Sequence, residues 1–255
     1  MLIKPDWPAP STVKAAITTR LGGVSASPFD SLNLALHVGD KPSSVLENRR
    51  LLELALASEF GCSPELQWLE QIHSCDLVHL SQQLDATPQA DAAYTQAPQL
   101  ACCVMTADCL PLLVCDRFGR EVAAVHAGWK GLANGIISKT LTSFNTPIED
   151  LLVYLGPAIS QKNFQVGRDV LEAFICAEQQ RPYSESIRHA FVKDALDASR
   201  YRADLYRLAL AELQGAGVQA IFGGQYCTYD APDLFSYRQS AECGRMVSLI
   251  WLSSL

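Results

Sequence analysis

Short runs of apolar and β-branched residues divide the chain, each bounded by Gly, Pro, Asp or Asn. Runs of this length and composition predict β-strands. Several are apolar at consecutive positions instead of alternating, which indicates strands that are buried on both faces. The predicted strands occupy residues 10–19, 66–73, 76–80, 100–106, 110–116, 121–127, 151–157, 218–224 and 246–252.

Helical signals are fewer. Ser44 and Glu47 have the spacing of a capping box, in which each side chain satisfies a free backbone N–H at the start of a helix. The helix behind them is expected to end at Gly61, because glycine readily adopts the closing conformation. Further helices are predicted at residues 132–144, 168–179 and 202–214. Since strands outnumber helices and do not alternate strictly with them, the pattern favours a mixed α/β (α+β) sandwich over a regular dinucleotide-binding fold.

Composition narrows the class of protein. The chain has 255 residues, of which 49% are hydrophobic and 18% charged, as expected for a globular protein with a substantial core. No apolar run approaches the roughly 18 residues of a membrane span, and the first ten residues lack the apolar stretch of a signal peptide. The net charge of -7, without a Lys/Arg cluster, argues against nucleic acid as a partner. We therefore expect a cytoplasmic protein with no nucleic-acid or membrane partner.

The nine cysteines are predicted to be free thiols. Without an export signal they belong in a reducing compartment, and an odd number excludes complete internal pairing. The absence of any CxxC pair argues against a four-cysteine zinc site and a thioredoxin-type motif. Cys102, Cys103 and Cys115 lie within apolar runs and are expected to be small core residues.

The segments 110–116 and 121–127 flank a turn-like stretch and predict a β-hairpin. Two registers are open: paired residue numbers add up to 235 if the loop is Arg117-Phe118, or to 237 if it is Phe118-Gly119. Cys109 lies directly opposite His126 in the first register and diagonal to it in the second. Both registers place the two side chains on one face, about 5 to 8 Å apart, which a zinc ion can bridge. A one-residue bulge would reverse this, and a core thiol beside a core histidine remains an equal alternative.

His73 is the natural third ligand of such a site, although local spacing does not bring it close. Asp91 and Asp108 are open between orienting the histidines and a structural role, which for Asp108 is that of a turn residue. The remaining histidines are not expected to bind metal: His37, His79 and His189.

At these residues the sequence resembles the YfiH family, also called the laccase-domain or multicopper polyphenol oxidase family. The resemblance spans nearly the whole chain, and its most specific parts are TADCLP and HAGWKG. Lys130 stands where relatives often have arginine, which keeps the charge but loses bidentate geometry. The other matching segments are TTRLGGVS, SLNLALHVGD, WLEQIHS, ADAAYT, YLGPAI, IFGGQYCTY, FSYR and GRMVSLIWL.

The resemblance implies one domain over residues 1–255 with an α/β/β/α sandwich of mixed sheets, similar to the catalytic domain of cytotoxic necrotizing factor toxins. It implies that His73, Cys109 and His126 are zinc ligands. It also implies a cytosolic purine nucleoside phosphorylase that acts on adenosine, inosine, guanosine and methylthioadenosine and deaminates adenosine. The expected partners are thus a purine nucleoside and phosphate, and we expect a monomer. A role in editing peptidoglycan precursors is an alternative that one family name implies.

Two histidines and one cysteine leave the fourth position of zinc open, which is the arrangement of a catalytic site. Phosphorolysis also needs a phosphate pocket, to which glycine-rich turns can contribute backbone N–H groups. The candidate positive side chains are Arg20, Lys130, Arg238 and Arg245.

Three other chemistries are weighed against the same residues. Five histidines without a His-x-His pair cannot build the centres of a multicopper oxidase, and Met105, in an apolar run, is a better core residue than copper ligand. Copper can still compete for the site, which leaves copper-dependent polyphenol oxidation as an alternative. The H-x-E and P-C-x-x-C signature of zinc deaminases is absent, so deamination requires another constellation. A metal-free hydrolase or amidase, with Cys109 as nucleophile and His126 as base, is the last alternative.

Overall fold

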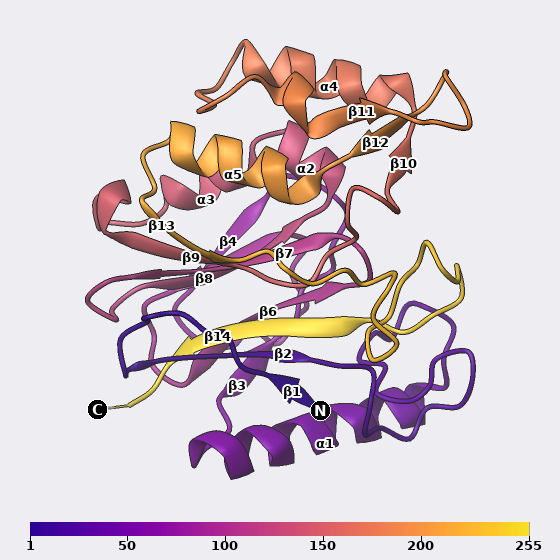
Figure 1. Ribbon diagram of the computed structural model, residues 1–255. Helices are drawn as coiled ribbons and strands as arrows, with labels where there is room; N and C mark the ends of the chain where they lie inside the picture. Colours follow the sequence, from indigo (N-terminus) through magenta and orange to yellow (C-terminus); the bar gives the residue numbers. More distant parts are fainter. Residues whose placement is uncertain (255) are drawn as a thin grey trace.

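The computed structural model describes residues 1–254, in which two large β-sheets pack face to face between layers of helices (Figure 1). The lower sheet in Figure 1 has the strand order β1-β2-β14-β6-β3, and the upper one has the order β13-β9-β7-β8-β5-β4. Helix α1 covers the outer face of the lower sheet, while α2, α3 and α5 cover the outer face of the upper sheet. The predicted mixed α/β sandwich is confirmed.

In the lower sheet the edge strands are short, whereas the central strands and the covering helix are longer. These elements are β1 (Leu2–Ile3), β2 (Val13–Thr18), α1 (Pro42–Phe60), β3 (Glu65–Gln67), β6 (Leu100–Thr106) and β14 (Met246–Leu252). The upper sheet and its helices comprise β4 (Leu77–Leu80), β5 (Ala92–Thr95), β7 (Leu110–Asp116), β8 (Val122–Ala127), α2 (Trp129–Ala133), α3 (Ile136–Leu141), β9 (Leu151–Leu155), α5 (Leu205–Gly215) and β13 (Ala220–Gly223).

A third, small sheet lies beyond the upper helices and has the order β10-β12-β11 (Figure 1). Its strands were not expected from the sequence, because each is too short for a hydrophobic pattern to develop. Its elements, with α4 and one 3-10 turn, are β10 (Gln165–Val166), α4 (Arg168–Glu178), η2 (Ile187–Ala190), β11 (Phe191–Lys193) and β12 (Tyr201–Ala203). Another 3-10 turn, η1 (Ile148–Asp150), directly precedes β9. Within residues 1–254, no helix is both long and apolar enough to cross a membrane.

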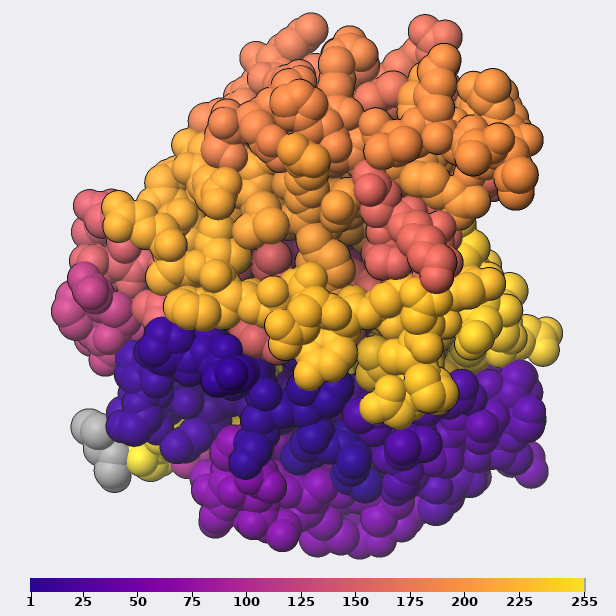
Figure 2. All heavy atoms as spheres, in the orientation of Figure 1, coloured from indigo at the N-terminus to yellow at the C-terminus, as the bar shows by residue number. Residues whose placement is uncertain are grey.

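Residues 224–245 connect the upper sheet to the last strand of the lower one. In Figure 2 this segment, orange to yellow, crosses one face of the molecule between the indigo N-terminal layer and the orange upper layer. It carries Tyr237 and Arg245.

Strands β7 and β8 are buried on both faces, as their unbroken apolar runs predicted. In β7, Leu112 and Val114 pack against the helices, whereas Leu113 and Cys115 face the other sheet. The corresponding division in β8 places its even-numbered residues toward the other sheet. The face that carries His126 is therefore the one between the two sheets.

The hairpin has the second of the two predicted registers. Leu110 pairs with Ala127 and Cys115 pairs with Val122, so the paired numbers add up to 237. Both open registers place the same side chains on the same face of the sheet. The observed pairing runs from Leu110 to Cys115 without a bulge. The inference that Cys109 and His126 share a face therefore holds for the register that forms.

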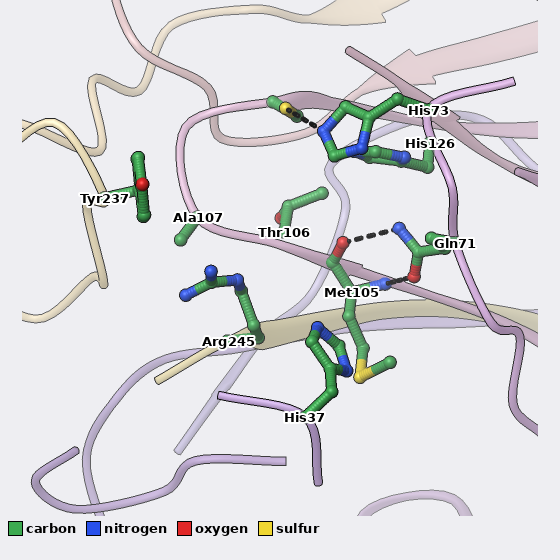
Figure 3. A pocket seen from close by; sticks show the side chains of 10 residues that line it. His37, Gln71, His73, Met105, Thr106, Ala107, His126, Tyr237 and Arg245 are labelled. Atoms are coloured by element: carbon green, nitrogen blue, oxygen red, sulfur yellow. Dashed lines mark hydrogen bonds between the residues drawn. The ribbon is translucent and has the colours of Figure 1, made fainter. Parts of the chain in front are cut away.

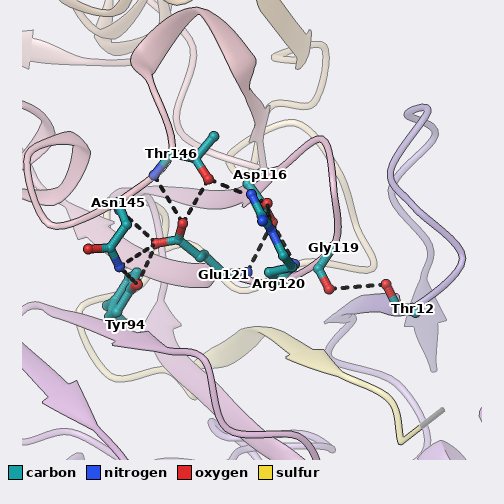
Figure 4. A network of polar contacts seen from close by, with 8 residues as sticks. All are labelled: Thr12, Tyr94, Asp116, Gly119, Arg120, Glu121, Asn145 and Thr146. Atoms are coloured by element: carbon teal, nitrogen blue, oxygen red, sulfur yellow. Dashed lines mark hydrogen bonds and ion pairs between the residues drawn. The ribbon is translucent and has the colours of Figure 1, made fainter.

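A buried polar network fixes this register at the loop end of the hairpin (Figure 4). The Asp116 carboxylate accepts hydrogen bonds from the backbone N–H groups of Arg120 (2.6 Å) and Glu121 (3.0 Å). The Glu121 carboxylate in turn accepts from the Thr146 backbone N–H at 3.0 Å and from the Tyr94 hydroxyl. Because both acids are almost completely buried, a slip of one residue would leave their charges without these donors.

The predicted capping box is wrong. Helix α1 begins at Pro42 after Lys41, and the residue before it makes no side-chain capping bond. Proline suits the first helical position because it lacks the N–H that would be unpaired there and already has a helical φ. Ser44 therefore lies inside the first turn. The predicted end is confirmed, since Gly61 has φ 79° and donates to the Ala57 carbonyl at 3.0 Å.

Further boundaries differ from expectation. The helix predicted at residues 202–214 begins later, at Leu205, because Tyr201–Ala203 forms strand β12. The helix predicted at residues 132–144 starts earlier, at Trp129, and is broken by Gly135, whose φ of +88° separates α2 from α3. The strand predicted at residues 66–73 ends as β3 at Gln67. The chain then leaves the sheet as a loop, in which the backbone N–H groups of Ile72 and His73 donate to the buried Asp91 carboxylate instead of to a neighbouring strand.

The caps of α1 and α5 can be compared by mutation. The Asp204 carboxylate accepts from the Arg207 backbone N–H at 3.0 Å, which makes it the cap of α5. We expect Asp204→Ala to lower the free energy of unfolding by about 1 kcal/mol. Ser44→Ala, at a position without a cap bond, should not lower it. Urea denaturation of the two variants checks this, and a larger loss for Ser44→Ala would contradict a helix start at Pro42.

Candidate metal centre

Cys109 and His126 are brought together by the ends of β7 and β8 that lie away from the hairpin loop. His126 lies within β8 and is 4% exposed. Cys109 directly precedes β7, after a turn at Asp108 whose φ is 89°. The Asp108 carboxylate accepts from the Thr228 hydroxyl and from the Arg238 backbone N–H, both at 2.6 Å. Asp108 thus takes the turn position considered from the sequence and anchors the turn that presents Cys109.

His73 comes from the loop between β3 and β4, with a left-handed φ of 59°. The buried Asp91 carboxylate holds this loop by accepting from the backbone N–H groups of His73 (3.1 Å) and Ser74 (2.6 Å). Asp91 also contacts His126 Nδ1 at 2.7 Å. One carboxylate therefore sets the positions of both histidines, and it lies just before β5, a strand that the sequence pattern did not reveal.

The three side chains converge on one point. Their potential ligand atoms all lie within 4.8 Å of one another. Cys109 Sγ is 3.9 Å from His73 Nε2, the contact dashed in Figure 3, and the two imidazole rings are 4.8 Å apart at 81°. Since Asp91 engages His126 through Nδ1, the other ring nitrogen is left for the convergence point.

Gly128 provides a test of whether these residues fit a metal ion. A Cβ at this position would lie 3.1 Å from Cys109 Sγ and 3.1 Å from the His73 ring. The absence of a side chain therefore leaves free space beside the donors. Two imidazole nitrogens and one thiolate are also ligands that zinc and copper accept. Donor set and space together fit a metal with one coordination position open.

Gly128→Ala should reduce metal affinity about tenfold, the lower end of the effect of residues surrounding metal ligands. The added methyl would press on Cys109 and His73, each at 3.1 Å. The backbone φ of -64° suits alanine, so the melting temperature should change little. Competition with a chromogenic chelator measures the affinity; an unchanged value would show that the donors do not need this space.

Charges at the site favour the thiolate of Cys109, which is the form that binds metal or acts as a nucleophile, but they also favour the protonated form of His126, which must lose its proton before it can bind metal. Burial opposes ionisation of Cys109, but the neighbouring His126 and His73 outweigh it and lower the pKa of the thiol to about 6. Burial also opposes protonation of His126, yet Cys109 and Asp91 raise its pKa to about 9. Without metal, the pair is therefore a thiolate beside an imidazolium at neutral pH.

The convergence point opens into a cavity of about 330 Å³ (Figure 3). Its wall combines the triad with aromatic, basic and thioether side chains from three separate segments. The lining residues are His37, Gln71, His73, Met105, Thr106, Ala107, Cys109, His126, Tyr237 and Arg245. Such a pocket has the size of small-molecule sites.

Of the basic residues singled out in the sequence, the cavity is lined by Arg245 and not by the other three. Arg20 pairs with Asp30 at 3.0 Å and stacks on Phe235. The Arg238 guanidinium donates to the Gln165 carbonyl at 3.0 Å. Lys130 is exposed on α2.

The cavity also contains residues that sequence reasoning missed. His37, set aside as a loop histidine, lies on the wall away from the triad (Figure 3). The Gln71 side chain exchanges two hydrogen bonds with the backbone of Met105, at 2.6 and 2.8 Å, and so ties the His73 loop to β6. Tyr237 is 54% exposed at the cavity. His37 and Gln71 lie within the matching segments SLNLALHVGD and WLEQIHS. The resemblance pointed to each of these motifs as a whole and not to the two residues.

A mixed α/β sandwich with a His/Cys group that could hold a metal ion beside a cavity is compatible with a small-molecule site of metalloenzyme type. Comparison with known proteins agrees with this class: the family model described as multi-copper polyphenol oxidoreductase laccase matches residues 14–253. Purine nucleoside phosphorylase PA4543 of Pseudomonas aeruginosa is 47% identical over 98% of both chains. Purine nucleoside phosphorylase YfiH of Escherichia coli is 45% identical, again over 98% of both. The chain belongs to the YfiH family.

Solved structures show the same fold. The crystal structure of Neisseria meningitidis protein NMB0706 is 42% identical over 99% of both chains, with a TM-score of 0.89. Bacillus licheniformis YfiH is 28% identical over 94% of this chain and 93% of its own, with a TM-score of 0.85. Despite the family model's description, residues 1–254 hold one group of three metal-ligand side chains. The several centres of a multicopper oxidase would need more such groups.

Proposed function

We propose that this chain is a metal-dependent purine nucleoside phosphorylase, which converts a purine nucleoside and phosphate into the free base and ribose 1-phosphate. The observation that carries the proposal is the convergence of His73, Cys109 and His126 on one cavity. It is supported by relatives that bear this enzyme name and are 45% to 47% identical over nearly the full length.

The chain's own residues prepare this cavity for binding. The Asp91 carboxylate accepts a hydrogen bond from His126 Nδ1 and so holds the imidazole ring in place. This bond also selects the tautomer in which the other ring nitrogen is free and faces the cavity. Met105 and Ala107 give the wall apolar surface, and Tyr237 offers an aromatic face for a purine ring. When bound by the triad, zinc would supply a Lewis acid with one open coordination position.

The finer parts of the proposal concern metal and substrates. We propose zinc as the resident metal, with copper as a competitor, and adenosine, inosine, guanosine and methylthioadenosine as substrates. Adenosine deamination is proposed as a side activity at the same site. A cytoplasmic monomer and a cellular role linked to peptidoglycan precursors complete the hypothesis; muropeptide analysis after gene deletion tests that role.

The test is a product assay on the purified, zinc-loaded protein. Adenosine with phosphate should yield adenine and ribose 1-phosphate, whereas adenosine without phosphate should yield no adenine. Inosine formed without phosphate reports deamination separately. A metal-replete protein that releases no base from any of the four nucleosides in the presence of phosphate would rule the proposal out.

A second candidate function rests on a specific arrangement. His126 contacts Cys109 on one side and Asp91 on the other, as the base of a metal-free hydrolase contacts its nucleophile and its orienting carboxylate. The candidate predicts that activity toward amides or esters survives complete removal of metal. Chelation with elemental analysis decides between the two, because the phosphorylase should lose its activity in step with its metal.

A further inference from the structure

The Arg245 guanidinium is a positive charge without a protein counterion. It lies just before β14, partly buried on the cavity wall. Its side-chain hydrogen bonds all leave from Nη1, to the carbonyls of Cys243 (2.8 Å) and Gly244 (3.1 Å) and to the Cys243 sulfur (3.5 Å). Across residues 1–254, no carboxylate lies within 4.0 Å, and Nε and Nη2 donate no hydrogen bond. A partly desolvated guanidinium with two free donors is a ready site for an oxyanion.

His37 adds a second nitrogen donor at the same end of the cavity, away from His73 and His126 (Figure 3). Burial and the nearby Arg245 and Arg49 charges lower the pKa of His37, while Glu70 acts in the opposite direction. Arg49 is engaged elsewhere, because its guanidinium donates to the Leu34 carbonyl at 2.9 Å. This end of the cavity therefore combines positive potential with side-chain donors, whereas the triad would carry the metal.

A buried asparagine holds both donors in place. The Asn33 side-chain oxygen accepts from the backbone N–H groups of Arg245 and Ala35, both at 3.0 Å. Its amide nitrogen donates to Asp40 at 3.0 Å and so closes the loop that carries His37. Residues more than 200 positions apart are thereby fixed side by side before any ligand binds. Such preorganisation lowers the cost of binding.

We propose that Arg245 and His37 form a subsite for a phosphate group at the end of the cavity opposite the triad. Arg245 would bind two oxygens through Nε and Nη2, and His37 a third. The ligand is either inorganic phosphate, as co-substrate, or the phosphate ester of a nucleotide. The first assignment rests on the proposed function; the subsite itself does not.

Isothermal titration with phosphate and with adenosine 5′-monophosphate tests the subsite directly. We expect Arg245→Gln to weaken binding of the relevant ligand about 10- to 100-fold, and His37→Gln to weaken it by a smaller factor. Arg168→Gln is the matched control, since it removes an equal charge from an exposed ion pair on α4. Cys109→Ala, which removes a triad donor, should leave phosphate-group binding to Arg245 measurable.

The titrations with the two ligands, together with the KM values, separate the possible outcomes. Weakened binding of inorganic phosphate, with a raised phosphate KM and an unchanged nucleoside KM, supports the subsite as the co-substrate site. Weakened binding of the nucleotide alone supports the subsite with the ester as ligand. If Arg245→Gln binds both ligands as the wild type does, the subsite is refuted even where phosphorolysis occurs. Base release failing in the wild type refutes the proposed function instead.

Discussion

Cys109→Ala should abolish tight metal binding while the protein remains folded. Cys109 is the one thiol in the triad, 3.9 Å from His73 Nε2. Residues that merely surround metal ligands contribute about 10- to 100-fold to affinity, so loss of a direct donor should cost more than about 100-fold. Chelator competition measures the loss, and phosphorolysis should fall with it. Cys176→Ala, at an exposed cysteine on α4, is the control and should match the wild type.

The same cysteine distinguishes ligand from nucleophile through its pH dependence. In metal-free protein the thiol has a pKa of about 6, so alkylation should be slow below that pH and reach its plateau above it. Saturating zinc should protect Cys109 across the range. Full alkylation in the presence of zinc, or wild-type metal affinity in Cys109→Ala, would contradict its assignment as a ligand.

Asp91→Ala should damage the metal site and the fold together. Burial opposes ionisation of Asp91, but hydrogen bonds from His126 and Ser74 outweigh it and lower the pKa of the carboxyl group. Its removal leaves the backbone N–H groups of His73 and Ser74 and His126 Nδ1 without an acceptor. We expect a loss of about 3 kcal/mol in the free energy of unfolding and about 10- to 100-fold in metal affinity.

The control for Asp91 is a nearby exposed carboxylate. Asp76 pairs with Lys139 at 3.0 Å on the surface, so Asp76→Ala should cost less than about 1 kcal/mol and leave metal affinity unchanged. Urea denaturation and chelator competition report the two effects separately. Equal effects of the two substitutions would mean that Asp91 acts only through its charge and not through its buried contacts.

Local pattern was reliable where one physical rule acts over a few residues. The unbroken apolar runs of β7 and β8 require burial on both faces, and the structure has it. Gly61 closes α1 because its φ of 79° is open to glycine. The capping box failed because Pro42 and Ser44 compete to start the same helix, and the spacing of side chains alone does not rank them.

The residues of the site also divide into those that local pattern predicts and those that it does not. Cys109 and His126 belong to one hairpin, so strand alternation places them on one face in either open register. His73 is brought in by Asp91, a contact between loops that no local period encodes. Arg245 and His37 line the same cavity, and Arg245 is held there by Asn33, more than 200 residues earlier in the chain. Side-chain contacts over such separations depend on the packing of whole sheets.

By itself, the sequence determined a mixed α/β protein, a buried hairpin and the shared face of Cys109 and His126. These features follow from the alternation of side chains between the two faces of a strand and from the residue types that form single turns. The resemblance in its motifs pointed to His73 and to the family. Only the tertiary structure decided which register forms, how Asp91 joins both histidines, and which basic residue faces the cavity. Those outcomes depend on buried charges finding partners from distant segments, and the folded arrangement alone brings these partners together.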